Sequence, residues 1–122
     1  MAFEEFNAKG GKFKPQIIIN KYGGFTLSSG MHHRYGIDKY MGVKLYFDAD
    51  TKKVGVRLID KEDDGMFKLK KRENEKGAFF SARSFWGAYN VDTQKVSGRY
   101  NPEEIEDEKF GKMFVITLIE KQ

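Results

Sequence analysis

The stretch that decides the fold is residues 19–48, INKYGGFTLSSGMHHRYGIDKYMGVKLYFD. Two adjacent glycines, Gly23 and Gly24, permit a tight turn between strands. After this turn, apolar Phe25 and Leu27 alternate with polar residues, which is the pattern of a strand with one buried face. Because β-branched residues precede the turn, we expect the two flanking segments to pair as a hairpin.

A short helix and a second hairpin are expected next. Ser28 or Ser29 can cap a helix over residues 30–35, and Gly36 can adopt the left-handed conformation that ends it. Residues 43–58 then contain two strictly alternating runs, VKLYF and VGVRL, on either side of the polar segment DADTKK. This pattern is typical of two strands joined by a turn.

The second half of the chain repeats this order of elements. A glycine precedes the segment AFFS (78–81), as one precedes FTLS in the first half, and Ser81 can cap a helix over residues 82–89. Asn90 also tolerates the left-handed conformation and stands where Gly36 ends the first helix. The similarity predicts two tandem copies of one structural unit.

The composition favours a single, mostly β domain. The chain has 122 residues, about the length of one domain, and 15% of them are aromatic. Aromatic and β-branched residues are enriched in strands. We therefore expect a flexible arm at residues 1–12 and one domain at 13–122, built from two β-β-α-β-β units at 13–59 and 61–119 with two short helices.

Residue content excludes several functional classes. Without cysteine, the chain has no thiol nucleophile, no cysteine zinc site and no disulfide scaffold. It also lacks a Gly-x-Ser-x-Gly elbow, a Walker loop and a His-Glu-x-x-His motif, so we expect neither enzyme activity nor a cofactor. No run approaches the roughly 18 apolar residues of a membrane span, and we expect a cytoplasmic protein without a membrane partner.

From residue 19 to residue 48 the chain resembles the swapped-hairpin DNA-binding domain of the AbrB, SpoVT, MazE and MraZ group of bacterial regulators. That family has a strand, a glycine turn, a strand closing on an Ile-Pro pair, a short helix ending in Leu-Gly-Ile, and an alternating strand. Here Gly23 stands at the turn and LS (27–28) at the Ile-Pro pair. YGI (35–37) stands at Leu-Gly-Ile, and VKLY (43–46) at the last strand.

The resemblance implies a barrel fold and DNA binding. Family members build a cradle-loop β-barrel from two copies of the unit, so two copies in one chain would close a pseudo-twofold barrel, as a monomer or a homodimer. The family also implies transcriptional regulation. The arginine that usually follows the turn glycine is Gly24 here, the proline is Ser28, and the helix arginines fall on His32 and His33, with Arg34 next.

Charge is distributed unevenly along the chain. The net charge is +4, but residues 103–108, EEIEDE, hold five acids in six positions. Residues 9–100 hold nineteen Lys and Arg against ten Asp and Glu. A basic body suits an anionic partner such as nucleic acid, and a solvated lysine-rich surface is the alternative.

The candidate nucleic-acid-binding residues are basic side chains in the turns and helix starts of both units. Phosphate binding needs flexible cations on one surface. Tyr22, Tyr35 and Trp86 are near these bases in sequence and can stack on exposed nucleobases. The candidates are Lys21, His32, His33, Arg34, Lys76, Arg83 and Arg99.

Three functional hypotheses follow from the sequence. The first is an AbrB-like DNA-binding regulator with a basic cradle, and the second is a small protein-interaction or inhibitory module, as phage and other mobile elements encode. The acidic segment and the departures at Gly24, His32 and His33 favour the second. The third is single-stranded nucleic-acid binding. No metal site is expected, because adjacent histidines on a helix point about 100° apart.

Overall fold

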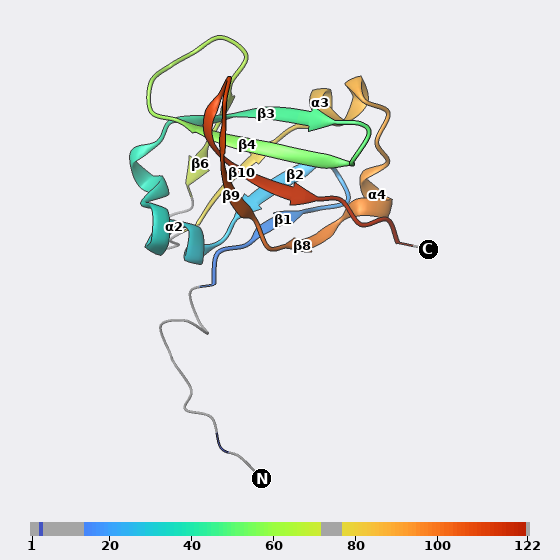
Figure 1. The fold of residues 1–122 in the computed structure, drawn as a ribbon, viewed down its shortest axis with the longest axis horizontal. Coiled ribbons are helices and arrows are strands. Elements are labelled where there is room, and N and C mark those ends of the chain that lie inside the picture. The colour runs from blue at the N-terminus through green and yellow to red at the C-terminus, as the bar shows by residue number, and fades with distance from the viewer. Residues whose placement is uncertain (1–2, 4–13, 72–76, 122) are drawn as a thin grey trace.

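The computed structural model describes residue 3 and residues 14–71 and 77–121 of the chain. Its strands form two antiparallel sheets of five strands each (Figure 1). Sheet A has the order β6-β7-β2-β1-β8 and contains β1 (Ile17–Ile19), β2 (Gly24–Leu27), β6 (Lys70–Lys71), β7 (Ala78–Ser81) and β8 (Gly98–Tyr100). Sheet B has the order β5-β3-β4-β10-β9 and contains β3 (Gly42–Asp48), β4 (Lys53–Ile59), β5 (Phe67–Lys68), β9 (Glu103–Asp107) and β10 (Gly111–Thr117). Apart from residue 3, the predicted arm at 1–12 lies outside the described residues.

Short helices lie at the two ends of the molecule (Figure 1). They are α2 (Ser29–Tyr35), the 3-10 helix η1 (Ile37–Lys39), α3 (Arg83–Ala88) and α4 (Thr93–Val96). Gly36 ends α2 at a φ of 63°, and Asn90 follows α3 at a φ of 54°, both in the predicted left-handed region. The prediction of a mostly β fold is confirmed, and α4 is a third helix that was not predicted. The side chain of Asp92 caps α4 by accepting a hydrogen bond from the Gln94 backbone N–H at 3.0 Å.

The serines predicted to cap helices do not make capping bonds with their side chains. Ser28 is the N-cap residue of α2, but its hydroxyl accepts a hydrogen bond from the Gln16 backbone N–H at 2.8 Å and donates one to the Lys14 carbonyl at 3.2 Å. It therefore links the start of α2 to the segment before β1. In the second half, the residue at the N-cap of α3 is Ala82, one position after Ser81.

The expected closed barrel is not seen, because no strand ladder joins sheets A and B in the described part of the chain. The chain instead turns two corners between the sheets. Leu69 alone separates β5 of sheet B from β6 of sheet A, and Asn101 and Pro102 separate β8 of sheet A from β9 of sheet B. Proline has no N–H to continue a ladder, and strands that switch sheets bend at such corners. At both corners the chain passes directly from one sheet to the other. The strand that it leaves and the strand that it enters pair with different neighbours.

Each sheet combines strands from both halves of the chain. In sheet A, β2 pairs with β7, so that Phe25 lies opposite Phe80. In sheet B, β4 pairs with β10, so that Val56 lies opposite Phe114. Since both pairs lie inside their sheets, neither half contains a complete sheet of its own.

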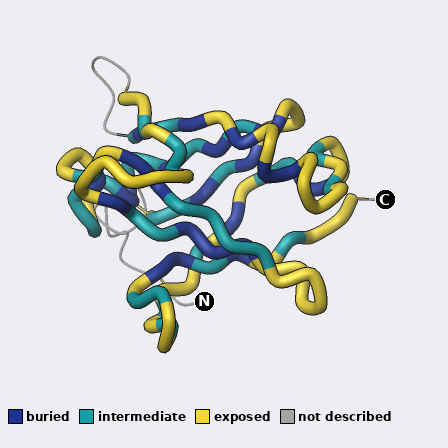
Figure 2. Tube along the Cα trace, turned by 90° about the horizontal axis from the view of Figure 1, so that it is seen from above, coloured by how far each residue is buried: buried dark blue, intermediate teal, exposed yellow. Residues whose placement is uncertain are grey.

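The core lies between the two sheets. Phe25 is fully buried and stacks on Phe80 at 4.8 Å and on Trp86 at 5.3 Å between ring centroids. Sheet B contributes buried residues such as Val56 and Phe114 to the same cluster. In Figure 2 the buried segments follow the strands, whereas the turns are exposed. The alternation noted in the sequence is thus the alternation between this core and solvent.

Candidate nucleic-acid interface

A row of five paired residues crosses the outer face of sheet A. The strand register places Ile18 opposite both Arg99 and Thr26. It places Phe79 opposite both Thr26 and Lys70. The neighbours of Ile18, Thr26 and Phe79 along their strands are buried, so alternation directs this row away from the core. The basic side chains of Lys70 and Arg99 therefore lie at the two edges of the sheet. The less polar side chains of Ile18, Thr26 and Phe79 lie between them.

The two sheets differ in the number of acidic residues on their strands. The strands of sheet A contain the bases Lys70, Lys71 and Arg99 and no acid among their described residues. The strands of sheet B contain five acids, four of them in β9, and also five basic residues, namely Lys44, Lys53, Arg57, Lys68 and Lys112. Because the outer faces of two packed sheets point in opposite directions, a polyanion meets fewer acids on the sheet A side.

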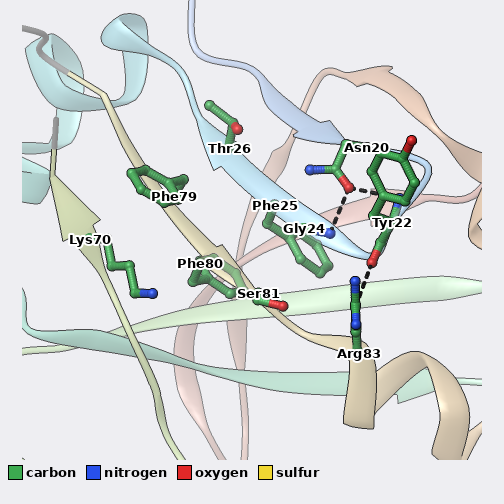
Figure 3. A pocket seen from close by; sticks show the side chains of 10 residues that line it. All are labelled: Asn20, Tyr22, Gly24, Phe25, Thr26, Lys70, Phe79, Phe80, Ser81 and Arg83. Atoms are coloured by element: carbon green, nitrogen blue, oxygen red, sulfur yellow. Dashed lines mark hydrogen bonds between the residues drawn. The ribbon is translucent and has the colours of Figure 1, made fainter.

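A shallow pocket of about 290 Å³ lies at one end of the outer face of sheet A (Figure 3). Lys70 and Arg83 lie on opposite sides of this pocket, with Ser81 between them in this view. The Asn20 side-chain oxygen accepts hydrogen bonds from two backbone N–H groups of the β1–β2 turn, each at 2.9 Å. Tyr22 projects from this turn and is 65% exposed. The pocket thus combines two cations, an amide and an exposed aromatic ring.

The β1–β2 turn is held against the start of α3. The Gly23 carbonyl accepts hydrogen bonds from the Ala82 backbone N–H at 3.1 Å and from the Trp86 indole N–H at 3.2 Å. Gly23 has a φ of 92°, and a Cβ on it would lie 3.1 Å from the Trp86 ring, so a larger residue fits poorly here. This docking brings Lys21 and Arg83 to the walls of one pocket of about 370 Å³. The Arg83 side chain donates to the Tyr22 carbonyl at 3.4 Å.

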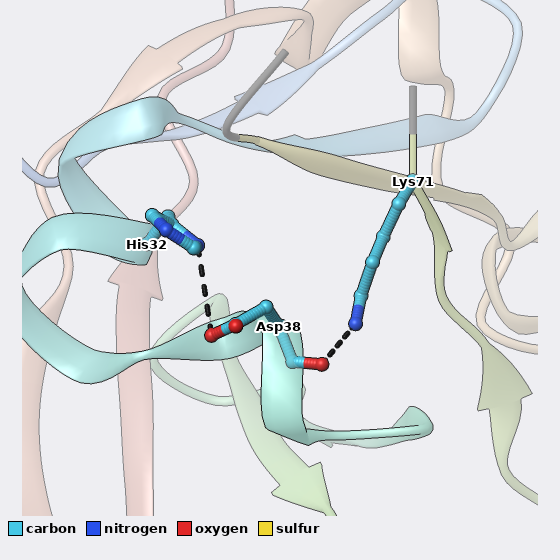
Figure 4. A network of polar contacts seen from close by, with 3 residues as sticks. All are labelled: His32, Asp38 and Lys71. Carbon is cyan, nitrogen blue, oxygen red and sulfur yellow. Dashed lines mark hydrogen bonds and ion pairs between the residues drawn. The ribbon is translucent and has the colours of Figure 1, made fainter. Parts of the chain in front are cut away.

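The predicted bases on α2 lie at the other end of the molecule from α3 (Figure 1). There the His32 ring nitrogen lies 3.7 Å from the Asp38 carboxylate, and the Lys71 ammonium donates to the Asp38 carbonyl (Figure 4). His33 and Arg34 are exposed on the same helix. The structure therefore does not gather the helix bases of both halves into one cradle. The helix α3 lies instead against the β1–β2 turn of the first half, whereas η1, which follows α2, lies beside Lys71 of the second half.

The remaining candidates differ in their surroundings. Arg99 lies on β8, where its guanidinium donates to the Gln16 side chain at 3.3 Å. Lys76 falls outside the described residues. Trp86 is 3% exposed and belongs to the core, so it does not provide a stacking surface. Tyr35 packs on Phe114 at 4.5 Å between ring centroids.

Sequence reasoning did not select four of the five members of this row, namely Ile18, Thr26, Lys70 and Phe79. Apolar and basic residues alternate from Phe67 to Lys70, which indicates a strand with an exposed basic face. Alternation alone, however, places Lys68 and Lys70 on the same face. The corner at Leu69 instead assigns Lys68 to sheet B and Lys70 to sheet A. The alternation of apolar and polar residues is the same whether or not the chain changes sheet at Leu69, so the sequence pattern could not reveal this corner.

Comparison with known proteins adds no identification. The chain matches no protein-family model, no curated protein and no solved structure. The resemblance of the first half to the AbrB group stays a prediction. Within residues 14–71 and 77–121, no three histidine or acidic side chains are grouped closely enough to hold a metal ion. None of the helices formed by these residues has the length and apolar character needed to cross a membrane.

Proposed function

We propose that this protein binds nucleic acid on the outer face of sheet A, single strands in preference to duplexes. The observation that carries the proposal is the placement of bases at both edges of a face whose strands contain no acid. Lys70 and Arg99 stand at the two edges, and Lys21 and Arg83 stand at one end. Together they form an array of four cations for backbone phosphates.

The dimensions of the face suit several nucleotides. Strands in a sheet lie about 4.8 Å apart, so Lys70 and Arg99 are separated by about 19 Å across five strands. A duplex advances about 3.4 Å per base pair, so the face spans about five base pairs or a comparable stretch of single strand. Four cations over this span can neutralise several phosphates at once.

The shape of the face favours single strands. Major-groove recognition uses a protruding helix or a β-ribbon, and the helices here are short and stand at the ends of the sheets. Single-strand binding uses an open sheet with aromatic rings on which bases stack. Tyr22 offers an exposed ring, with the Lys21 ammonium 5.3 Å from its centroid. Phe79 adds a half-buried ring between Thr26 and Lys70 in the row.

We also infer that the two halves are tandem copies that form a pseudo-twofold, barrel-like body. Aligning Leu27 with Phe80 makes Phe25 equivalent to Ala78. The register pairs Phe25 with Phe80 and Leu27 with Ala78, so a twofold rotation exchanges the two pairs. The strand order supports the same symmetry, because each sheet contains one hairpin-forming segment from each half. This arrangement is compatible with the predicted cradle-loop type.

The test is fluorescence anisotropy with a labelled 20-nucleotide oligo(dT) and a labelled 20-base-pair duplex. Each phosphate contact contributes about −0.7 to the slope of log affinity against log salt for single strands. Four contacts predict a slope of about −2.8, which is a loss of about 50-fold between 50 and 200 mM salt. The double variant Lys70→Glu/Arg99→Glu removes two contacts and should reduce the slope to about −1.4.

The matched control is Lys61→Glu/Lys109→Glu, which changes the net charge equally at exposed sites in the connections of sheet B. Equal weakening by the two double variants would contradict the proposed face. Absence of binding to either probe at 50 mM salt would contradict nucleic-acid binding altogether. Tighter binding of the duplex, lost on combined reversal of Arg34 and Arg83, would support the AbrB-like regulator instead.

A further inference from the structure

We propose that the outer face of sheet B docks an extended basic segment of another protein, which pairs with β9 as an added strand. This face points away from the outer face of sheet A, so the inference stands apart from nucleic-acid binding. It rests on an apolar hollow, a free strand edge beside it, and the charge of that edge.

The hollow has a volume of about 320 Å³ and is lined by Tyr46, Ile105, Phe110, Met113 and Val115. The rings of Tyr46 and Phe110 pack at 4.4 Å between centroids. These apolar side chains come from three strands, β3, β9 and β10, and from the β9–β10 turn. Three acids, Asp48, Glu103 and Asp107, and one base, Lys53, also line the hollow.

Two residues of β4 shape the hollow. The Met113 sulfur packs over Gly55, where a Cβ would lie only 2.6 Å from it, so glycine is needed for this close approach. The Arg57 guanidinium donates to the Phe110 carbonyl at 3.1 Å and holds the β9–β10 turn against β4. The Asp107 carboxylate tightens this turn by accepting from the backbone N–H groups of Lys109 and Phe110, each at 2.9 Å. The hollow is therefore preformed by packing and hydrogen bonds.

The strand beside the hollow, β9, has one edge that pairs with no other strand among the described residues. The edge strands of the two sheets are β5, β6, β8 and β9. With five residues, β9 is the longest of them in the described structure, since the other three have two or three. Its unpaired backbone groups can receive another strand, and Ile105 on β9 turns its side chain toward the hollow. An added strand would thus extend the sheet and the apolar patch together.

Charge selects the kind of strand that can pair here. Four of the five residues of β9 are acidic. Glu104 is paired with Lys112 at 2.7 Å, while Glu103 and Glu106 are exposed acids on the same strand. A second copy of β9 would place like charges opposite one another, which is unfavourable, and nucleic acid would be repelled. A segment that alternates basic and apolar residues satisfies both the edge and the hollow.

The proposal is tested with a seven-residue peptide that alternates lysine with valine or isoleucine. Titration into the isotope-labelled full chain is followed by amide NMR shifts, which should move on β9 and around the hollow. An acidic peptide with glutamate in place of lysine should not bind. A lysine peptide with N-methylated alternate amides keeps the charge but cannot pair as a strand, and it should bind at least tenfold more weakly.

Matched protein variants separate this site from general electrostatic attraction. Glu103→Lys/Glu106→Lys should weaken binding of the lysine peptide at least tenfold. The control Glu62→Lys/Glu120→Lys makes the same charge change at exposed acids elsewhere and should alter affinity by less than twofold. Equal effects of the two pairs, or equal binding of the methylated peptide, would overturn the proposal. No binding at about 1 mM peptide would show that the acidic edge only prevents aggregation.

Discussion

Replacing Phe25 with alanine tests whether the two halves of the chain share one core. Phe25 is 1% exposed and lies between the parallel rings of Phe80 from β7 and Trp86 from α3, at interplanar angles of 9°. Loss of a buried phenylalanine side chain typically costs about 3–5 kcal/mol, including the cavity that is left. Each stacked ring pair contributes about 0.5–1.5 kcal/mol beyond burial. We therefore expect Phe25→Ala to lower the free energy of unfolding by about 4 kcal/mol.

That loss is a large share of the total stability, which is about 5–15 kcal/mol for a domain of this kind. It corresponds to a decrease in Tm of about 12–20 °C. The assay is urea unfolding followed by both Trp86 fluorescence and far-UV circular dichroism, with Tyr22→Ala as the control. Tyr22 is exposed, so its replacement should change the free energy of unfolding by less than about 0.5 kcal/mol.

The number of transitions provides a second measurement. Because β2 pairs with β7 and β4 pairs with β10, unfolding of one half must disrupt both sheets. Fluorescence and circular dichroism should therefore report one coincident transition in the wild type and in the variant. A cost below about 1 kcal/mol for Phe25→Ala, or two separate transitions, would refute the shared core.

Three further substitutions test local features. Gly23→Ala should destabilise the protein by about 1–3 kcal/mol, because of its positive φ and the nearby Trp86 ring; a smaller change in urea unfolding would contradict this. Ser28→Ala should cost about 1–2 kcal/mol through its lost hydrogen bonds, measured likewise, and an unchanged stability would refute it. The hydrogen bond from Lys44 lowers the pKa of Asp63 below its ordinary value of 3.8. The ion pair therefore stabilises the folded protein above pH 3.8, and this stabilisation is lost as the pH falls through the lowered pKa. In Lys44→Met, NMR titration should show the Asp63 pKa rising toward 3.8, and an unchanged pKa would exclude this cause.

Much of the local structure could be predicted because it depends on short-range patterns. Gly36 and Asn90 marked the ends of α2 and α3, since few residues adopt a positive φ without strain. The alternating runs marked β3 and β4. The helix α4 was missed although Asp92 is a favourable cap, because four residues are too few to show a helical period.

The candidate site was predicted only in part. Lys21 and Arg83 were named from the sequence, and the docked β1–β2 turn brings them together. Lys70 was not selected, because the corner at Leu69 decides which sheet it joins. His32 was grouped with Arg83 on the expectation of one cradle, whereas the structure places α2 and α3 at opposite ends. These placements depend on contacts between residues about 50–60 positions apart in the sequence, which local sequence patterns do not encode.

The sequence by itself determined the mostly β character and the positions of several turns and of two helices, α2 and α3. These follow from side-chain period, turn residues and caps, which act over a few neighbouring positions. Only the tertiary structure decided that the halves interleave, that the strands form two separate sheets, and that the acids of the described strands all lie in sheet B. Those features depend on which strands pair across the core, and pairing is set by the burial of both halves together.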